Sequence, residues 1–370
     1  MNKERISGTQ TAMLLFMVIA PTAMLFNPGL SASTAKQSAW LVPFIGGIFA
    51  FPALLIAVKL GLRFPRLTFT EYMPLIAGKF GGKILSALYT LFLVALNIII
   101  VRETSELLTM TSLFETPMIV VNLFLVLICG YISQKGIEVI VRMNQFILPL
   151  FTLAYLLAFI LPLPKADSGN LLPLLEEGIT PVIRNIGIPA LYYSETAVLL
   201  MLIPFINKPQ ETLKKGSYAV MATIFFMTFG SLSVLVMIGP EMTGKMIFPL
   251  WFVAKGIEYG NYIQRVETIL LPLWLTGIMI KSSLFINITV LAATQTISRK
   301  HPKLIAVFIG LVVFGGATFA FPNTMVLLEL LTTYWPPLAV LFQIMLPFLV
   351  LVLAVIRKKE GGVSFCKEGQ

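Results

Sequence analysis

The segment "IRNIGIPALYYSET", residues 183–196, interrupts a long apolar region with a glycine, a proline, two tyrosines and an acid. It continues into "AVLLMLIPF", and other charge-free runs, such as residues 37–58 and 336–356, recur along the chain. A helix of roughly 20 apolar residues crosses the hydrocarbon core of a bilayer, which is about 30 Å thick. The segment therefore places an interruption and a carboxylate, that of Glu195, inside a membrane-spanning helix.

The composition indicates a protein with many membrane spans. Hydrophobic residues make up 57% of the 370 residues and charged residues only 12%, with a mean hydropathy of +0.90. Soluble domains contain about 25% charged residues. Only helices and closed barrels satisfy every backbone group in lipid, and continuous apolar runs without alternation exclude the barrel. We therefore predict an all-α integral membrane protein whose ten candidate spans are residues 10–33, 40–60, 83–105, 117–134, 143–162, 184–206, 217–238, 262–294, 303–321 and 335–356.

The distribution of Lys and Arg supports ten spans with the N- and C-termini in the cytoplasm. With this topology 19 of the 27 basic residues lie on the cytoplasmic side, seven lie outside, and Lys281 lies within a span. This bias follows the positive-inside rule. A signal peptide running from "MNKER" to "APTA" is the alternative for the first span, but its loss leaves an odd number of spans. Topology explains the net charge of +10, so we expect no nucleic acid partner.

No motif of an enzyme is recognisable in the sequence. There is one histidine and there are two cysteines, which form no zinc cluster, and there is no phosphate-cradling glycine loop. No paired acid and base supports catalysis within the membrane. We therefore expect no enzymatic activity, no metal and no cofactor.

Ten spans divide into two groups of five, and the groups have opposite orientations because five is odd. This arithmetic is typical of inverted-repeat transporters, whose sites lie where discontinuous helices meet near the bilayer midplane. We expect one transmembrane domain with repeats at about 10–162 and 184–356 and a short cytoplasmic tail at 357–370. Each repeat begins with an interrupted span, "IAPTAMLFNPG" at 19–29 and "NIGIPALYYSE" at 185–195.

Proline and glycine are the residues that interrupt these two spans. Proline removes an amide hydrogen bond and clashes with the preceding turn, and glycine relaxes the backbone. Freed backbone groups are tolerated in a membrane where they line a cavity or meet protein partners. We predict broken helices at Ala20–Met24 and at Gly187–Pro189, which together form a binding site. A simple proline kink is the alternative for either span alone.

Five motifs are distributed over nearly the whole chain: "ISGTQ" at 6–10, "TFTEYMPLIAGKFGGK" at 68–83, "ALYYSE" at 190–195, "QRVE" at 264–267 and "IKSSLFIN" at 280–287. In their order and spacing the chain resembles the permease-like B subunits of spore-germination nutrient receptors, a branch of the amino-acid/polyamine/organocation superfamily. The resemblance implies a LeuT-like fold with spans 1, 3, 6 and 8 around a site for a small nutrient such as an amino acid. It also implies the inner membrane of a bacterial spore as the location and receptor subunits of A and C type as partners. A proton-coupled amino acid permease and a channel component are the alternative functions.

The two interruptions supply the predicted ligand contacts. The resemblance matches Glu195 to a glutamate in the sixth span of relatives. It departs from them at the first interruption, where Ala20–Ala23 replace a glycine-rich segment that lets a ligand carboxylate reach bare amides. The predicted ligand-binding residues are Ala20, Pro21, Thr22, Ala23, Met24, Gly187, Pro189, Tyr192, Tyr193 and Glu195.

Two ionisable residues lie deep within predicted spans. Counted inward from Arg184, Glu195 lies about 15 Å deep, where an unpaired charge costs at least ~2.5 kcal/mol. Lys281 lies at a similar depth and is followed by Ser282 and Ser283. Sodium-coupled proteins of this fold class hold a sodium ion between the first and eighth spans. We expect the ammonium group of Lys281 either to substitute for that ion or to pair with an acid such as Glu195 as a structural tie.

Further charged residues lie at the predicted outer ends of spans. Arg102 and Glu106 are four residues apart at the end of the third span, so that they can pair on one helix face. Arg265 and Glu267 open the eighth span on the same side. We predict that Arg102, Glu106, Arg265 and Glu267 form an outer gate or a partner interface, with an interfacial anchor and a snorkelling arginine as the alternative.

Overall fold

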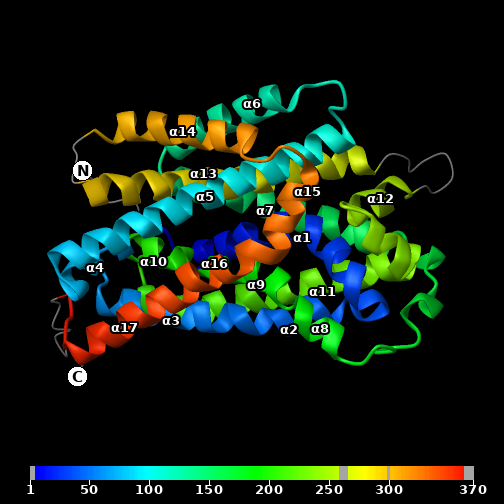
Figure 1. Cartoon of the computed structure of the whole chain (residues 1–370), viewed down its shortest axis with the longest axis horizontal. Helices are drawn as coiled ribbons and strands as arrows, with labels where there is room; N and C mark the ends of the chain where they lie inside the picture. The colour runs from blue at the N-terminus through cyan, green and yellow to red at the C-terminus, as the bar shows by residue number, and fades with distance from the viewer. Residues whose placement is uncertain (1–4, 258–265, 298–300, 362–370) are drawn as a thin grey trace.

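The computed structural model describes residues 5–257, 266–297 and 301–361, and helices make up most of these ranges. The α-helices, labelled in Figure 1, are α1 (Gly8–Ala35), α2 (Leu41–Gly46), α3 (Ala50–Arg63), α4 (Phe69–Ala77), α5 (Lys79–Thr111), α6 (Met118–Ser133), α7 (Ile137–Ile160), α8 (Thr180–Asn185), α9 (Gly187–Tyr193), α10 (Leu199–Leu202), α11 (Thr212–Lys245), α12 (Pro249–Lys255), α13 (Glu267–Ile297), α14 (Pro302–Phe319), α15 (Thr324–Glu329), α16 (Trp335–Val340) and α17 (Leu346–Ile356). The 3₁₀ segments are η1 (Lys36–Ser38), η2 (Gly47–Phe49), η3 (Leu163–Lys165), η4 (Ser168–Leu171), η5 (Ser194–Val198), η6 (Ile203–Phe205) and η7 (Pro209–Glu211). The π segments are η8 (Leu330–Tyr334) and η9 (Leu341–Met345).

The helices correspond to the ten predicted spans. Within the described ranges nine helical stretches are long and apolar enough to cross a membrane, and α6, with 16 residues, is a shorter apolar helix in the place of the fourth span. Four boundaries differ clearly from the prediction, because α5 continues to Thr111, α7 begins at Ile137, α11 continues to Lys245 and the tenth span begins at Thr324. The seventh span, α11, contains a kink at Gly239, where φ is 76°, directly after its predicted end.

Two of the sequence motifs quoted above begin helices. In "ISGTQ" the Ser7 side chain accepts a hydrogen bond from the Gln10 amide, and the Gln10 side chain accepts one from the Ser7 amide. In "TFTE" Thr68 and Glu71 form the same capping box at the start of α4. Each box satisfies two amides that lack partners inside the helix.

Two glycines of "GKFGGK", Gly78 between the helices and Gly82 in the first turn of α5, allow α4 to pack closely on α5. Gly78 has a φ of 88°, which lets the chain turn between the two helices. Gly82 lies against the backbone of α4, and a Cβ added there would be 2.3 Å from the Cα of Pro74. Hydropathy did not predict α4, which is a short helix between the second and third spans.

The first span forms the centre of the molecule. Helix α1 is buried along most of its length and packs against α7, α9, α11 and α13. Helices α6 and α14 lie along one edge beside α5 and α13, whereas α2, α3 and α17 lie along the opposite edge (Figure 1). Segments far apart in the sequence therefore surround α1.

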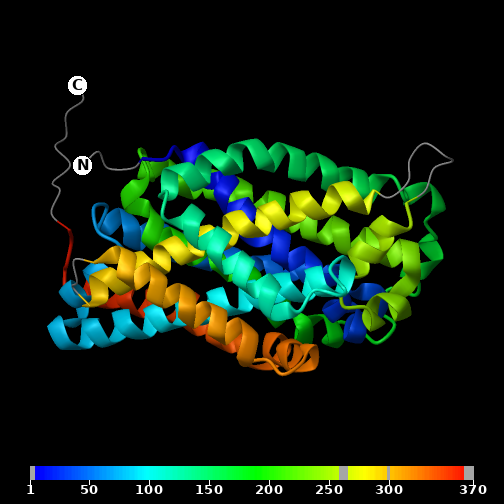
Figure 2. The same cartoon turned by 90° about the horizontal axis from the view of Figure 1, so that it is seen from above.

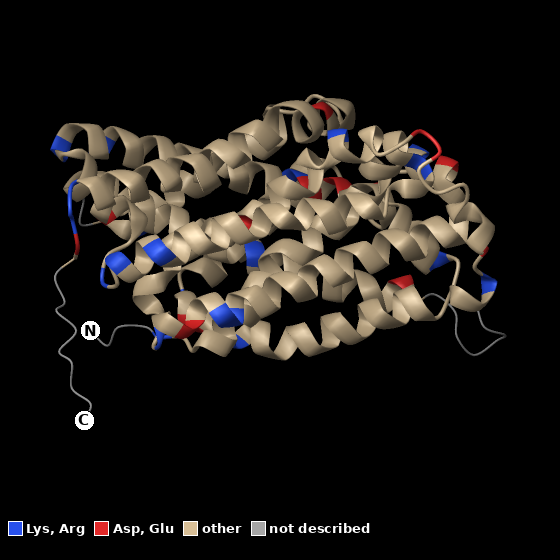
Figure 3. Ribbon diagram, turned by 90° about the horizontal axis from the view of Figure 1, so that it is seen from below, with Lys and Arg blue, Asp and Glu red and all other residues tan. Residues whose placement is uncertain are grey.

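The start of α1 and the end of α17 lie at the same end of the molecule (Figure 2). At this end the Ile6 amide donates to the Phe205 carbonyl at 2.8 Å, and Arg63 Nε donates to the Lys359 carbonyl at 2.7 Å. At the other end Lys36 forms an ion pair of 2.5 Å with Glu177. Charged residues gather at both ends and only a few lie between them (Figure 3). An even number of spans brings the first and last helices back to the same end of the molecule, as is found here.

The two predicted helix breaks differ in outcome. In the sixth span α8 ends at Asn185 and α9 begins at Gly187, and the 3₁₀ segment η5 separates α9 from α10. The predicted break beside Gly187 is therefore confirmed, and a longer irregular segment follows it at Ser194–Val198.

The predicted break in the first span is wrong. Helix α1 runs without interruption through Ala20–Met24, although Pro21 and Pro28 lie within it. Each proline removes only one amide hydrogen bond, at a cost of about 3 kcal/mol, and the surrounding alanine, leucine and methionine residues favour a helix. Packing on all sides and a hydrogen bond of 2.6 Å from Trp274 Nε1 to the Pro21 carbonyl help to hold this helix together.

Candidate functional site

Lys281 is the centre of a buried polar network. It lies in the middle of α13, and its side chain is 0% exposed. Its Nζ lies 2.7 Å and 2.9 Å from the two carboxylate oxygens of Glu195 and donates to Thr22 Oγ1 at 2.6 Å. One ammonium group therefore connects the first, sixth and eighth spans. Pairing matters here because an uncompensated charge in the membrane interior is costly.

The sixth span presents two polar groups on one face where α9 is followed by the 3₁₀ segment η5. Residues three apart lie on the same face of an α-helix and of a 3₁₀ helix. Tyr192 is the second-last residue of α9, three residues before Glu195 of η5, and the ring centroid of Tyr192 is 5.7 Å from Lys281 Nζ. The winding of the interrupted span thus aligns the tyrosine and the carboxylate with Lys281.

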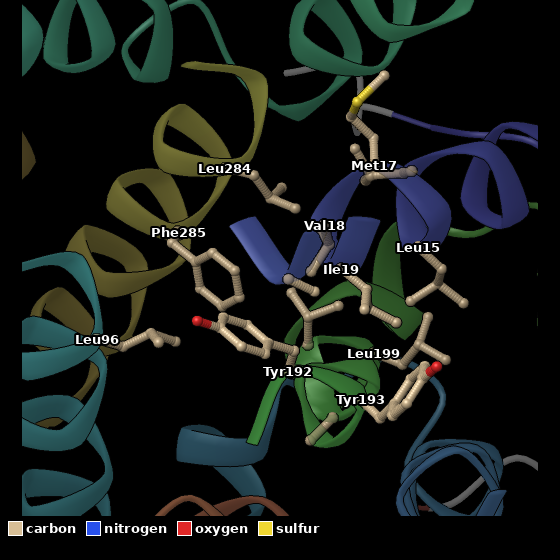
Figure 4. Close-up of a cluster of buried hydrophobic side chains, with 14 of the residues drawn as sticks. Leu15, Met17, Val18, Ile19, Leu96, Tyr192, Tyr193, Leu199, Leu284 and Phe285 are labelled. Atoms are coloured by element: carbon tan, nitrogen blue, oxygen red, sulfur yellow. The ribbon is translucent and has the colours of Figure 1, made fainter. Parts of the chain in front are cut away.

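The Tyr192 hydroxyl extends the network to the third span. It donates to Glu103 Oε1 of α5 at 2.8 Å, and the Glu103 side chain is buried. The ring of Tyr192 lies beside Phe285 and Leu96, whereas Tyr193 points in a different direction (Figure 4). The Tyr193 hydroxyl donates to the Pro43 carbonyl of α2 at 3.1 Å. Only the first of the two tyrosines therefore faces the network.

A second buried ion pair lies further along α5. Arg102 Nη2 lies 2.8 Å from Glu106 Oε1, which confirms the predicted pairing. Arg102 also donates to the Ala317 carbonyl of α14 at 3.2 Å, and Thr324 of α15 donates to Glu106 at 2.9 Å. The predicted position at the outer surface is wrong, because α5 continues to Thr111 and the ends of α14 and α15 cover the pair.

Several predicted site residues lie outside the network. Ala20, Ala23 and Met24 are buried within the continuous helix α1. Pro189 packs against α2, since a Cβ added to Gly46 would be 2.5 Å from the Pro189 side chain. Gly187 faces α16, where an added Cβ would be 3.5 Å from Pro336.

The predicted site residues that follow Lys281, and those at the start of α13, also lie outside the network. Ser283 donates to the Met279 carbonyl of its own helix at 2.6 Å, and Ser282 lies beside Cys129 of α6. Glu267 is the half-buried first residue of α13. Arg265, the other predicted gate residue in "QRVE", lies outside the described residues.

Two contacts to the interrupted span were not predicted. Glu103 binds Tyr192, and Gln343 of the tenth span accepts a hydrogen bond from the hydroxyl of Ser194. Gln343 lies in the π segment η9, and such segments are frequent at functional sites. A polar residue in a charge-free apolar span was the available sequence signal for Gln343.

Comparison with known proteins identifies the family. The sequence model of the family described as "Spore germination protein" matches residues 5–325. The chain belongs to this family. Spore germination protein KB of Bacillus subtilis (strain 168) is 25% identical over 381 residues, with 100% of both chains covered. Spore germination protein YndE of the same organism is 25% identical over 305 residues, which cover 81% of this chain and 82% of YndE.

Two solved transporter structures share the fold of this germination protein. A Na⁺-coupled sialic acid symporter in a substrate-bound outward-open state has a TM-score of 0.64 and 15% identity, with 95% of this chain and 78% of the symporter covered. MhsT in complex with L-phenylalanine has a TM-score of 0.66 and 12% identity, with 96% of this chain and 99% of MhsT covered. The chain therefore has the LeuT-like inverted-repeat fold. At these identities the similarity establishes the fold alone.

The fold and the network together describe a permease-like membrane protein of spore germination. Spans 1, 3, 6 and 8 contribute Thr22, Glu103, Tyr192 with Glu195, and Lys281. These are the four spans that the resemblance placed around a site. The first span contributes a side-chain hydroxyl and not an unwound backbone.

Proposed function

We propose that this germination protein is the nutrient-sensing membrane subunit of a spore germination receptor. It binds a small molecule, such as an amino acid, among spans 1, 3, 6 and 8. Its membership in the spore germination family and its transporter fold support this role. The proposal places the protein in the spore inner membrane, with both termini in the cytoplasm and receptor subunits of A and C type as partners.

The contacts of Lys281 are the observation that carries the proposal. A ligand that inserts among Thr22, Tyr192 and Glu195 has to rearrange hydrogen bonds on three spans at once. A ligand shifts a conformational equilibrium only through different contacts in the two states. The network provides such contacts, because each of its helices continues to an end of the molecule where partner subunits can respond.

The test is an exchange of side chains in spores whose nutrient response depends on this chain. Substitutions at Thr22, Met24, Tyr192 and Tyr193 are compared at equal amounts of protein in the membrane. We expect substitutions at Thr22 and Tyr192 to change which nutrient triggers germination. If every substitution alters only the amount of protein, the four side chains have packing roles and the proposed site is wrong.

A proton-coupled amino acid permease is the alternative, and the fold shared with two transporters favours it. Vesicles that contain the purified full-length chain separate the two functions. Accumulation of a labelled amino acid against its gradient, driven by an imposed pH difference, supports the permease. Saturable binding without accumulation supports the sensor.

We propose the pair of Arg102 and Glu106 as an outer gate. It connects α5 with α14 and α15 through Ala317 and Thr324, and its buried position favours a gate over an interfacial anchor. Breaking the pair removes the contact between α5 and α15, the first helix of the tenth span. Substitution of Thr324 by Val removes one hydrogen bond to Glu106 and keeps both charges, so it tests the gate without exposing a buried ion.

A further inference from the structure

The buried charges of the described chain do not balance. Five charged side chains are buried, namely Arg102, Glu103, Glu106, Glu195 and Lys281. With every group ionised, three carboxylates face two cations. Arg102 pairs with Glu106 and Lys281 pairs with Glu195, so Glu103 is the carboxylate without a cation of its own.

The contacts of Glu103 agree with this count. Within the described part of the chain, the Tyr192 hydroxyl is the hydrogen-bond donor to its side chain, and it occupies Oε1. The neighbouring cation, Lys281, directs its hydrogen bonds elsewhere, to Glu195 and Thr22. A buried anion needs a paired charge or a proton to be tolerated in a membrane. Among the hydrogen bonds of the described residues, the one to Glu103 goes to Oε1, which leaves Oε2 for a ligand.

The first span offers little to a ligand anion in this structure. Pro21 has no amide hydrogen, and the other amides of Ala20–Met24 lie inside the continuous helix α1, where they are engaged in the helical hydrogen-bond pattern. The site therefore presents a carboxylate with an open oxygen and no set of bare amides. This chemistry selects a cationic group over a carboxylate.

We propose that Glu103 is the recognition group for the ammonium group of a primary amine, and that it carries a proton when no ligand is bound. This inference rests on the proposed ligand site and names the chemical class of its ligand. On binding, the carboxylic acid releases its proton to water, and the carboxylate accepts a charge-assisted hydrogen bond from the ammonium group at Oε2. Tyr192 keeps its bond to Oε1. A carboxylate on the ligand is not required.

Other titratable groups lie near Glu103, and a measurement of its protonation has to distinguish its signal from theirs. Tyr192 and Glu195 face Glu103 from the sixth span, and Lys281 faces it from the eighth. Cys129 lies on α6 beside α5, and Arg102 and Glu106 lie on α5 itself. A signal is assigned to Glu103 only when it disappears in a variant of that residue.

Infrared spectroscopy of the full-length protein in lipid nanodiscs tests the proton. We expect the wild type without ligand to show the carbonyl stretch of a protonated carboxylic acid. Glu103→Gln should abolish this band. Glu138→Gln is the matched control, because Glu138 pairs with Arg142 in an exposed position and should leave the band unchanged. A band that persists in Glu103→Gln overturns the assignment of the proton.

A matched pair of probes, isobutylamine and isobutanol, tests recognition. We expect the amine to bind the wild type at least about tenfold more tightly than the alcohol, to diminish the acid band and to release a proton. Glu103→Gln should lose the preference. If that variant does not fold, Glu103→Asp serves instead, since it keeps the acid band but should weaken amine binding. Equal binding of both probes, or a preference that survives in Glu103→Gln, contradicts the proposal.

L-Valine and its amine-free analogue 2-hydroxyisovalerate distinguish failure of this inference from failure of the proposed function. If both bind equally to the wild type, a nutrient site exists but Glu103 does not recognise ammonium. If neither these compounds nor other amino acids, sugars or nucleosides bind, the nutrient site itself is wrong. The acid band then still decides whether Glu103 holds a proton.

Discussion

The ammonium group of Lys281 has contacts that suit both roles expected for it. Its bond to Thr22 joins the first and eighth spans, where sodium-coupled relatives of this fold class hold their ion, and its pair with Glu195 is a structural tie. The bond goes to the Thr22 hydroxyl and not to a backbone carbonyl, because α1 is a continuous helix through Ala20–Met24. The two roles differ in what happens when both charges are removed.

Lys281→Met should lower the amount of folded protein, because Glu195 then stays buried without its cation. Breaking a buried pair in this way costs about 3–5 kcal/mol. The double variant Lys281→Met/Glu195→Gln removes both charges and should recover most of the folded protein. Thermal unfolding of the purified protein and its level in the membrane measure this recovery.

The nutrient response of the double variant separates the two roles. If Lys281 substitutes for an ion, the recovered protein should give no response and the wild type should respond without sodium. A double variant with full response, or a strict sodium requirement in the wild type, contradicts the ion substitute.

The two adjacent tyrosines provide a matched comparison. Tyr192→Phe removes the hydroxyl that binds Glu103, and Tyr193→Phe removes the one that binds the Pro43 carbonyl. Each loses one hydrogen bond, worth about 1 kcal/mol, so both should unfold at slightly lower temperatures. Only Tyr192→Phe should also shift the nutrient concentration needed for half-maximal response. Equal shifts in both variants would show that the response follows stability and not the network.

Among the helices, the sixth span and the first span have opposite characters. The sixth is divided into α8, α9, η5, α10 and η6, whereas α1 is a single helix. Short segments joined by irregular winding can change their relative directions at little cost, while a continuous helix moves as one body. We therefore expect movement within the sixth span to change the contacts of Glu195 while α1 keeps its shape.

The packing of α4 on α5 gives a test that is independent of any ligand. Gly82→Ala places a Cβ 2.3 Å from the Cα of Pro74, and backbone cannot move aside as a flexible side chain can. Overpacking of this kind costs about 1–3 kcal/mol. Gly81→Ala is the control, since nothing lies within 4 Å of its added Cβ. We expect a lower unfolding temperature for Gly82→Ala and an equal or slightly higher one for Gly81→Ala, whereas equal effects would contradict the close approach of α4.

The sequence predicted the spans well because a bilayer demands a fixed length of apolar residues. It placed the end of the third span too early, since Arg102 and Glu106 are buried against α14 and α15 and do not lie at the membrane surface. It offered a pair of Lys281 with an acid such as Glu195 as one of two alternatives, because buried charges need partners, and the structure contains this pair. It missed the bond between Tyr192 and Glu103, because the depth of a residue along a helix does not give the direction of its side chain around the helix.

The final prediction concerns the orientation of the molecule in the membrane. The structure gathers Arg63, Lys208 and Lys359 at the end where the described chain begins and finishes, and Lys36 and Glu177 at the other. We propose that the first end is cytoplasmic, since basic residues are enriched in cytoplasmic loops.

Labelling of single-cysteine variants tests this orientation directly. In a background of Cys129→Ala and Cys366→Ala, Glu177→Cys should react with a membrane-impermeant maleimide on intact cells, and Lys208→Cys only after permeabilisation. Both positions are exposed, with side-chain exposures of 50% and 75%, and both replace partners of exposed ion pairs, which contribute little to stability. A difference in labelling therefore reports the side of the membrane and not a difference in access or folding. Labelling of Lys208→Cys on intact cells, with Glu177→Cys protected, would reverse the proposed orientation and assign the basic end to the outer side.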